Sequence, residues 1–336
     1  MQDLPFGHAS SRAVLVVALA VLSAQVPPVC AQENWKPARS VTLIAPNAPG
    51  GTSDRTAREL QRIIQKHRLV EVPINVVNRP GGNGTIALNQ LHAHPGDGHV
   101  LLISTSANLI AHIAGLAPYS HADFTPLSLM MEEYFGINVR AESPVQSAHD
   151  LLDRLKKNPA ALSFGTASVA GNNYTSLLLA LKKGGVDVRH LKTVTFAGGG
   201  QSVMALLGGH VDAISTGLSN MADQLQQGRV RTLVVTGPRR MGGPFAAVPT
   251  WKEVGVDVVQ TSWRGIMAPK GLNRAQVAYW DGVFRKVTQT EDWKTEVQDN
   301  YWANIYAGAV ESKRRMDEEY AEQKQILTEL GMAKTQ

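Results

Sequence analysis

The sequence contains very little cysteine, and its charges form no large patch of one sign. Its only cysteine, Cys30, lies in an N-terminal segment that we expect to be removed, so the mature chain would have neither a disulfide nor a thiol nucleophile. Lys and Arg number 33 against 28 Asp and Glu, which gives a net charge of +5. The basic run 313–315 is followed directly by acidic residues at 317–319, a pattern typical of a solvated helix face. We therefore predict no nucleic-acid partner.

Motifs that carry catalysis or bind cofactors are also missing. The glycines at 50–51 and 198–200 lack the Gly-Lys-Ser/Thr of a phosphate loop and the spacing of a dinucleotide site, and no Gly-x-Ser-x-Gly occurs. His92, His94 and His99 cluster without the carboxylates or the spacing of a zinc site, which favours exposed loop histidines. The sequence thus predicts no cofactor, no metal, no catalytic residue and no enzyme.

The N-terminus has the pattern of a secretory signal peptide. Arg12 precedes an apolar run at 13–24, then Pro27 and Pro28, and small or medium residues precede a cut before Gln32. Twelve apolar residues are too few for a membrane anchor, and Val29 is a poor residue before a lipid-modified Cys30. We expect residues 1–31 to be removed and the mature protein to reside in the periplasm.

The stretch 41–54 is the feature around which the rest of the chain can be arranged. An apolar run at 41–45 leads into prolines and glycines, and a segment with apolar residues at helical spacing follows Ser53 and Asp54. This predicts a strand, a tight loop and a helix whose first N–H groups suit an anion. The alternative is an ordinary turn in which Ser53 or Asp54 caps the helix, and such turns are the commoner case.

Similar strand–loop–helix units recur along the chain and predict an α/β fold. Three units up to residue 106 favour a parallel sheet, and the pattern restarts near residue 134. We expect a two-lobed clamshell of the type II periplasmic-binding-protein kind, with mostly parallel sheets and two chain crossings. Lobe 1 would comprise 32–135 and 235–336, and lobe 2 would comprise 136–234. Residues 231–236 would form a strand that returns toward lobe 1.

The loops at the strand ends are rich in glycine, serine and threonine. Open α/β sheets bind ligands at the carboxyl ends of their strands, and main-chain N–H groups with small hydroxyls suit carboxylates. A cleft of this kind favours binding over catalysis. Most of the six tryptophans are expected in the core, although Trp263, beside Ser262 and Arg264, could reach the cleft.

Several motifs in order resemble the substrate-binding proteins of tripartite tricarboxylate transporters, also called Bug receptors. They are Ala-Pro-Gly-Gly-Thr-Ser-Asp at 48–54, Val-Asn-Arg-Pro-Gly-Gly-Asn-Gly at 77–84, Asp-Gly-His-Val-Leu-Leu-Ile-Ser-Thr-Ser at 97–106, Asp-Phe-Thr-Pro at 123–126, Leu-Leu-Gly-Gly-His-Val-Asp at 206–212, Gly-Arg-Val-Arg-Thr-Leu-Val-Val-Thr at 228–236 and Val-Pro-Thr at 248–250. The resemblance covers the whole mature chain. It implies a periplasmic receptor that closes on a small organic acid, aromatic or with two or three carboxylates, and delivers it to membrane permease subunits. We also expect the protein to be a monomer.

The resemblance also implies a set of ligand-binding residues. The first-lobe loop, the strand-end hydroxyls and the second-lobe loop at 165–175 would hold the carboxylate, and Asp212 would support the cleft or the hinge. The predicted residues are Pro49, Gly50, Gly51, Thr52, Ser53, Asp54, Thr105, Ser106, Gly165, Thr166, Ser168, Asn173, Thr175, Gly198 and Asp212.

This chain departs from the family pattern in the second lobe. Val169 replaces a usual glycine, Thr175 stands where the family often has histidine, and residues 195–198 lack the common Tyr and Lys. These departures leave the identity of the ligand open. Two other functions stay open at this stage: a ligand sensor for a membrane signalling partner, and a secreted hydrolase or transferase.

Overall fold

The computed structural model describes residues 1–3, 35–166, 171–196 and 199–334. The chain divides into two compact units, Met1–Trp35 and Lys36–Gln336, and every helix and strand discussed below belongs to the second. Most of the expected signal peptide lies outside the described residues. Within the described parts of the chain, we find no helix with the length and apolar character needed to cross a membrane.

The second unit alternates strands and helices along most of its length. The strands are β1 (Val41–Ala45), β2 (Ile74–Asn78), β3 (Val100–Thr105), β4 (Phe124–Arg140), β5 (Ser163–Thr166), β6 (Lys192–Thr195), β7 (Ala213–Gly217), β8 (Val230–Val235), β9 (Thr261–Pro269) and β10 (Ala303–Gly308). The α-helices are α1 (Thr52–Lys66), α2 (Thr85–His92), α3 (Ser106–Ile113), α4 (Ala148–Lys157), α5 (Asn172–Lys183), α6 (Gly199–Leu207), α7 (Ala222–Gln226), α8 (Arg274–Gln289), α9 (Glu291–Asp299) and α10 (Ala309–Glu329). The short 3₁₀ segments are η1 (Gly82–Gly84), η2 (His121–Asp123), η3 (Val188–His190), η4 (Leu218–Asn220) and η5 (Gly243–Phe245).

The strands form two sheets that share β4. Sheet A has the order β2-β1-β3-β9-β4, with β10 also paired to β4, and sheet B has the order β4-β7-β5-β6, with β8 also paired to β4. Pairing is parallel among β1, β2 and β3 and among β5, β6 and β7, but β9, β10, β7 and β8 all run antiparallel to β4. The expectation of mostly parallel sheets is therefore wrong for the middle of the structure. The parallel pattern holds only for the outer strands.

Strand β4 is much longer than the sequence pattern predicts. Its first part, as far as Tyr134, pairs with β9 in sheet A, and from Phe135 onward it pairs with β7 in sheet B. The sequence pattern predicts a strand only at 135–139. Pro126, Glu132 and Glu133 interrupt the apolar residues that precede it. Pro126 is tolerated because the register with β9 shifts beside it, as at a β-bulge.

The chain returns from sheet B to sheet A beside the middle of β4. The strand expected at 231–236 is β8, which pairs with β4 in sheet B and ends beside Gly136, close to where the two sheets meet. The Thr236 amide donates to the Phe135 carbonyl at 2.9 Å, and the Gln260 amide donates to the Thr236 carbonyl at 3.1 Å. The chain segments at 135, 236 and 260 thus lie side by side where the two sheets meet.

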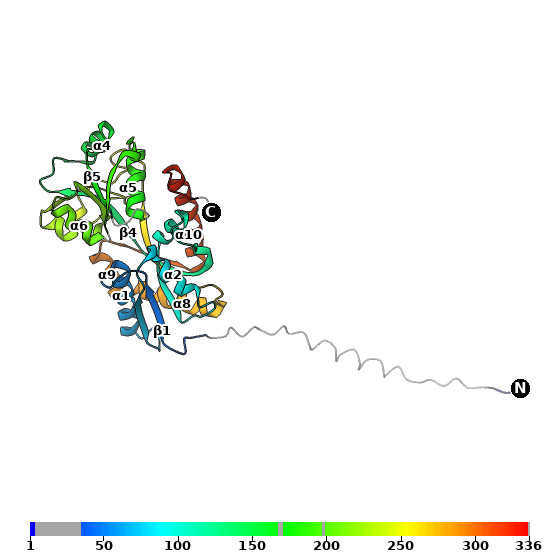
Figure 1. The fold of residues 1–336 in the computed structure, drawn as a ribbon. Coiled ribbons are helices and arrows are strands. Elements are labelled where there is room, and N and C mark those ends of the chain that lie inside the picture. Colours follow the sequence, from blue (N-terminus) through cyan, green and yellow to red (C-terminus); the bar gives the residue numbers. More distant parts are fainter. Residues whose placement is uncertain (4–34, 167–170, 197–198, 335–336) are drawn as a thin grey trace. The chain divides into compact units, whose positions relative to one another are not determined.

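Separate apolar cores pack on the two sheets. One contains Ile44, Leu102 and Trp263 of sheet A, and another contains Phe164 of β5 and Trp251. In Figure 1, α1, α2 and α8 surround β1, whereas α4, α5 and α6 surround β5. Helix α10 belongs to both groups, because Met316 packs in the first core and Ile326 in the second.

Candidate functional site

A cavity of about 280 Å³ lies where residues from both sheets meet at strand ends. Asn47 follows β1, Thr105 ends β3, and Thr216 and Gly217 end β7, so the cavity lies at the carboxyl ends of these strands. The lining residues are Asn47, Thr52, Ser53, Thr105, Ala107, Glu133, Phe135, Gly171, Asn172, Asn173, Gly199, Thr216, Gly217, Asn220, Ser262 and Arg264.

Four helices begin at this cavity. Helices α1, α5 and α6 contribute their first residues, Thr52, Asn172 and Gly199, and α3 contributes its second residue, Ala107. The residues before α1 and α5 are Gly51 and Gly171, and neither supplies a side-chain cap. The first N–H groups of a helix have no partner within it, and each helix dipole favours an anion by about 0.3–1 kcal/mol. The cavity is therefore suited to an anionic group.

The loop before α1 is fixed by Asp54, the third residue of the helix. Asp54 is only 2% exposed, and its carboxylate accepts hydrogen bonds from the Gly50 amide at 2.8 Å, Asn78 at 2.8 Å and Arg58 at 3.1 Å. Burial alone would raise the pKa of Asp54, but the bonds from Arg58, Gly50 and Asn78 outweigh it and hold the pKa below its usual value. Gly50 adopts a φ of +80°, which favours glycine. Asp54 thus shapes the loop and stays ionised, but it does not line the cavity.

On the side of sheet B, Asn173 is fixed between two strands. Its side-chain amide donates to the Ser215 carbonyl at 2.9 Å and to the Thr166 hydroxyl at 3.2 Å, and the Ser215 hydroxyl donates to the Asn173 carbonyl at 2.8 Å. The neighbouring Asn172 donates to the carbonyl of Thr261, in β9 of sheet A, at 3.5 Å. The start of α5 therefore contacts both sheets at the cavity.

The cavity also contains a buried ion pair that we did not predict. Arg264 of β9 donates to Glu133 of β4 at 2.9 Å, and their side chains are only 9% and 6% exposed. The Ser219 hydroxyl donates to the other oxygen of Glu133 at 2.8 Å, and the Arg264 guanidinium lies 5.7 Å from the ring centre of Trp302. No local motif marks this pair, because 131 residues of chain separate its members.

The structure brings four of the predicted site residues into the lining: Thr52, Ser53, Thr105 and Asn173. Pro49, Gly50 and Gly51 form the adjoining loop, and Ser106 lies behind the lining, where its hydroxyl donates to Ser262 at 3.1 Å. Ser168 and Gly198 lie outside the described residues. The predicted site residues around the β1 and β3 ends therefore gather near one cavity.

The other predicted residues do not line it. Gly165 packs against Ile214 and Phe196, Thr166 is fully buried under Asn173, and the Thr175 hydroxyl bonds back to its own helix at the Asn172 carbonyl. Asp212 precedes β7, at the opposite end from Thr216 and Gly217, and accepts two bonds of 2.7 Å from Ser163. It therefore supports the start of β5 and β7. We expected Asp212 to support the cleft or the hinge, but these bonds lie at the other end of the strands. Trp263 lies in the core, as we expected for most tryptophans, and its indole nitrogen donates to Glu319.

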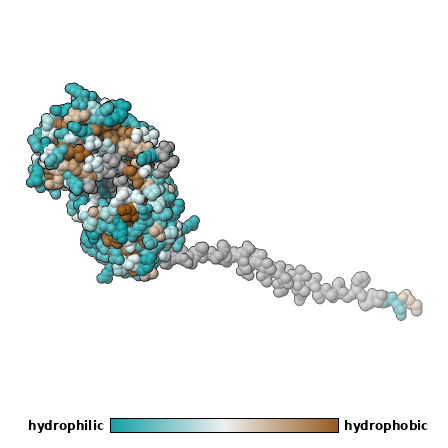
Figure 2. Space-filling view, viewed as in Figure 1, coloured by the Kyte–Doolittle hydropathy of each residue, from teal (hydrophilic) through white to brown (hydrophobic). Residues whose placement is uncertain are grey.

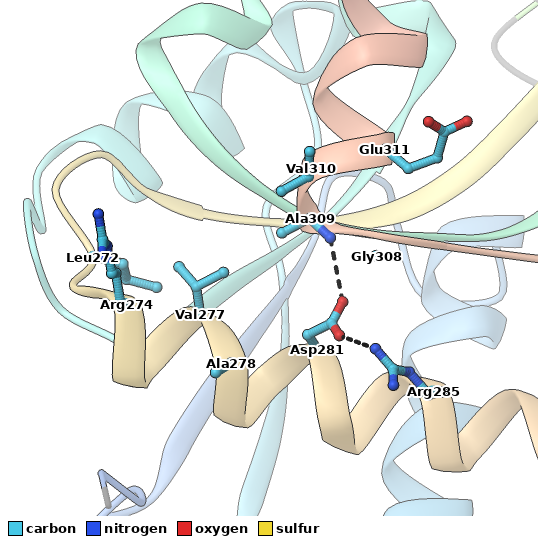
Figure 3. A pocket seen from close by; sticks show the side chains of 10 residues that line it. All are labelled: Leu272, Arg274, Val277, Ala278, Asp281, Arg285, Gly308, Ala309, Val310 and Glu311. Atoms are coloured by element: carbon cyan, nitrogen blue, oxygen red, sulfur yellow. Dashed lines mark hydrogen bonds and ion pairs between the residues drawn. The ribbon is translucent and has the colours of Figure 1, made fainter. Parts of the chain in front are cut away.

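Larger cavities lie elsewhere on the described surface. One of about 520 Å³ lies between α8 and the start of α10, where Val310 is 89% exposed. In Figure 3, Asp281 of α8 points to the Ala309 amide and to Arg285, so this carboxylate already has partners within the protein. On the face drawn in Figure 2, hydrophilic residues cover most of the surface and hydrophobic residues occur in small groups. The cavity at the strand ends differs from this one because it brings several helix starts together with hydroxyl side chains.

Comparison with known proteins identifies the family to which this chain belongs. Residues 56–332 match the family model described as "Tripartite tricarboxylate transporter family receptor". A relative from Cupriavidus necator, named UPF0065 protein in gbd 5'region, is 28% identical over 336 residues, which cover 98% of this chain and 99% of the relative. The family resemblance seen in the motifs is confirmed.

Solved structures of similar fold include two proteins from Rhodopseudomonas palustris. MatC with bound malate is 25% identical, with a TM-score of 0.76 over 87% of this chain and 99% of MatC. Rpa4515 with adipate is 24% identical, with a TM-score of 0.79 over 88% of this chain and 99% of that protein. These likenesses confirm the predicted two-lobed α/β class.

Proposed function

Because the chain belongs to the tripartite tricarboxylate transporter receptor family, we propose that it captures a small organic carboxylate in the cavity at the strand ends and delivers it to a membrane permease. The observation that supports this most strongly is the meeting of four helix starts at one cavity with Thr52, Ser53 and Thr105. Malate in MatC and adipate in Rpa4515 are both carboxylates, which supports the same class of ligand here.

In this proposal the ligand's carboxylate takes the place of water at the helix starts. The N–H groups at the start of α1 and the hydroxyls of Thr52 and Thr105 would donate to its oxygens from sheet A. Asn173 and the starts of α5 and α6 would contact it from sheet B. Since the carboxylate would touch residues of both sheets, binding would favour the closed arrangement.

Closure would be a bend where the two sheets meet. We propose that residues 32–135 with 235–336 form one lobe and residues 136–234 the other. The segments at 135, 236 and 260 lie side by side at that boundary, so small changes there would move one sheet relative to the other. The ligand would be released without breaking a buried ion pair to the protein.

We further propose that residues 1–31 are a signal peptide and that the receptor acts in the periplasm as a monomer. Delivery to a permease and signalling to a membrane sensor would use the same closed form. Pull-down of ligand-bound protein from membranes, with the ligand-free form as control, distinguishes the two by the partner that is captured. No set of a nucleophile and a base supports a hydrolase or transferase at this cavity among the described residues.

The test is native mass spectrometry of protein purified from the periplasm, followed by calorimetry with a broad set of carboxylic acids. A retained acid, or binding that Thr52→Val weakens about tenfold, is the expected result. A protein that binds no acid at all, while it melts cooperatively, would overturn the proposal.

A further inference from the structure

The only charged residues in the cavity lining, among the residues that the structure describes, are Glu133 and Arg264. They bond each other at 2.9 Å with both side chains more than nine-tenths buried. Because their charges are opposite, the lining has no net charge. It therefore has no spare countercharge for a second carboxylate on the ligand.

The carboxylate of Glu133 is held in place from several sides. It accepts from Ser219 at 2.8 Å, and a Cβ atom at Gly217 would overlap it. The guanidinium of Arg264 lies over the ring of Trp302, 5.7 Å from its centre. A ligand that approached the pair would thus meet the negative charge of Glu133 in a fixed position.

Three buried polar atoms of lining residues have no hydrogen-bond partner in the described structure. They are Nε of Arg264, which is a donor, and the side-chain oxygens of Asn47 and Asn172, which are acceptors. The Asn172 amide nitrogen faces the Thr261 carbonyl, which fixes its oxygen as the free acceptor. Buried polar groups normally have partners, so a ligand that both donates and accepts would complete this set.

We propose that the cavity selects acids that have one carboxylate and one hydroxyl over dicarboxylates of the same length, an inference that rests on the proposed function. The carboxylate would lie at the helix starts, and the hydroxyl would lie at the Glu133–Arg264 pair. A hydroxyl can accept from Arg264 and donate to Glu133 or to an asparagine oxygen. A second carboxylate would accept from Arg264 but would be repelled by Glu133, and this repulsion lowers its affinity.

The experiment is calorimetry on the exported protein with matched pairs of acids. The pairs are succinate with γ-hydroxybutyrate, glutarate with δ-hydroxyvalerate, and adipate with ω-hydroxyhexanoate. In the pair of the best-fitting length, the hydroxy acid should bind about tenfold more tightly than the dicarboxylate. A dicarboxylate that binds as tightly as its hydroxy partner, or more tightly, would overturn the inference.

Variants of the pair test the physical cause. Glu133→Gln removes the repulsion and leaves Arg264 without a countercharge, so the dicarboxylate should gain about tenfold relative to its partner. Glu142→Gln, at an exposed glutamate outside the cavity lining, is the matched control and should leave the preference unchanged. Because Glu133→Gln could destabilise the fold, melting is followed for each variant, and the neutral double variant Glu133→Gln/Arg264→Gln should lose the preference altogether.

The outcomes separate the two proposals. If no acid of any pair binds, the proposed function fails together with this inference. If acids bind but the preference is the same in the native protein and in both Glu133 variants, only the inference fails.

Discussion

Replacement of Asp54 by alanine should destabilise the protein by a measurable amount. From the sequence alone we expected Asp54→Ala and Thr52→Val both to weaken binding while the melting temperature stayed within a few degrees. The hydrogen bonds of Asp54 change this expectation for Asp54 only. Its carboxylate is nearly inaccessible and accepts from Gly50, Asn78 and Arg58, whereas Thr52 lies in the cavity lining.

The loss of stability in Asp54→Ala depends on whether each former partner of the carboxylate finds another hydrogen bond. A hydrogen bond to a charged group contributes about 1.5–3 kcal/mol. Arg58 is 53% exposed and Gly50 is exposed, so water can replace Asp54 for these two, and Asn78 keeps its bond to the Asn47 carbonyl at 2.9 Å. The free energy of unfolding should therefore fall by about 2–4 kcal/mol rather than by the full sum. For a chain of this size that corresponds to a melting temperature lower by about 4–8 °C.

Calorimetric melting and ligand titration on the same samples check this prediction. Thr52→Val, which keeps the side-chain shape, is the matched control: it should weaken binding about tenfold and change the melting temperature by less than about 2 °C. If Asp54→Ala has the melting temperature of the native protein and only binds the ligand more weakly, the assignment of Asp54 as a residue that shapes the loop is wrong.

Other features lead to further predictions. Burial raises the pKa of Glu319 to about 8, so the folded state holds a proton that the unfolded state releases above about pH 4.5. The free energy of unfolding should therefore fall by up to about 1.4 kcal/mol per pH unit between these two pH values. Glu319→Gln should flatten this pH dependence in melts from pH 5 to 8. Gly217→Ala should displace Glu133 and lower affinity about tenfold in calorimetry, while Gly200→Ala, in open space, should not. Ile326→Ala should lower the free energy of unfolding by about 2–4 kcal/mol in urea melts, because α10 would lose its contact with the core on sheet B.

Local patterns predicted the elements that depend on local sequence. Residues 41–45 form β1 as expected. The sequence pattern also predicts helices at 273–288 and 291–299, and these match α8 and α9 to within a residue. These segments have apolar residues at a regular spacing and clear ends. Asn273 and Thr290, for example, cap α8 and α9 with their side chains.

Features that depend on residues far apart in the chain were not predicted from the sequence. The length of β4 was missed because its interruption at Pro126 is resolved only by a register shift against β9. Glu133 and Arg264 each look like an ordinary charged residue on a strand, and only the pairing of β4 with β9 turns them into a buried pair. Asp54 was assigned to the ligand because its role depends on Asn78, which lies in the next strand.

The pairing of β3 with β9 has a consequence for how the chain folds. Leu102 and Met267 are neighbours in sheet A although most of sheet B lies between them in the sequence. Bringing β3 and β9 together is slow because so many residues separate them. Sheet A cannot form its middle until β9 is present, because β9 lies between β3 and β4. Nascent chains that end before residue 261 should therefore leave β3 with an unpaired edge, which favours binding by chaperones. The N-terminal third of this protein should thus be unable to form its native sheet early, and a chain that stays unfolded during synthesis remains competent for transfer across a membrane.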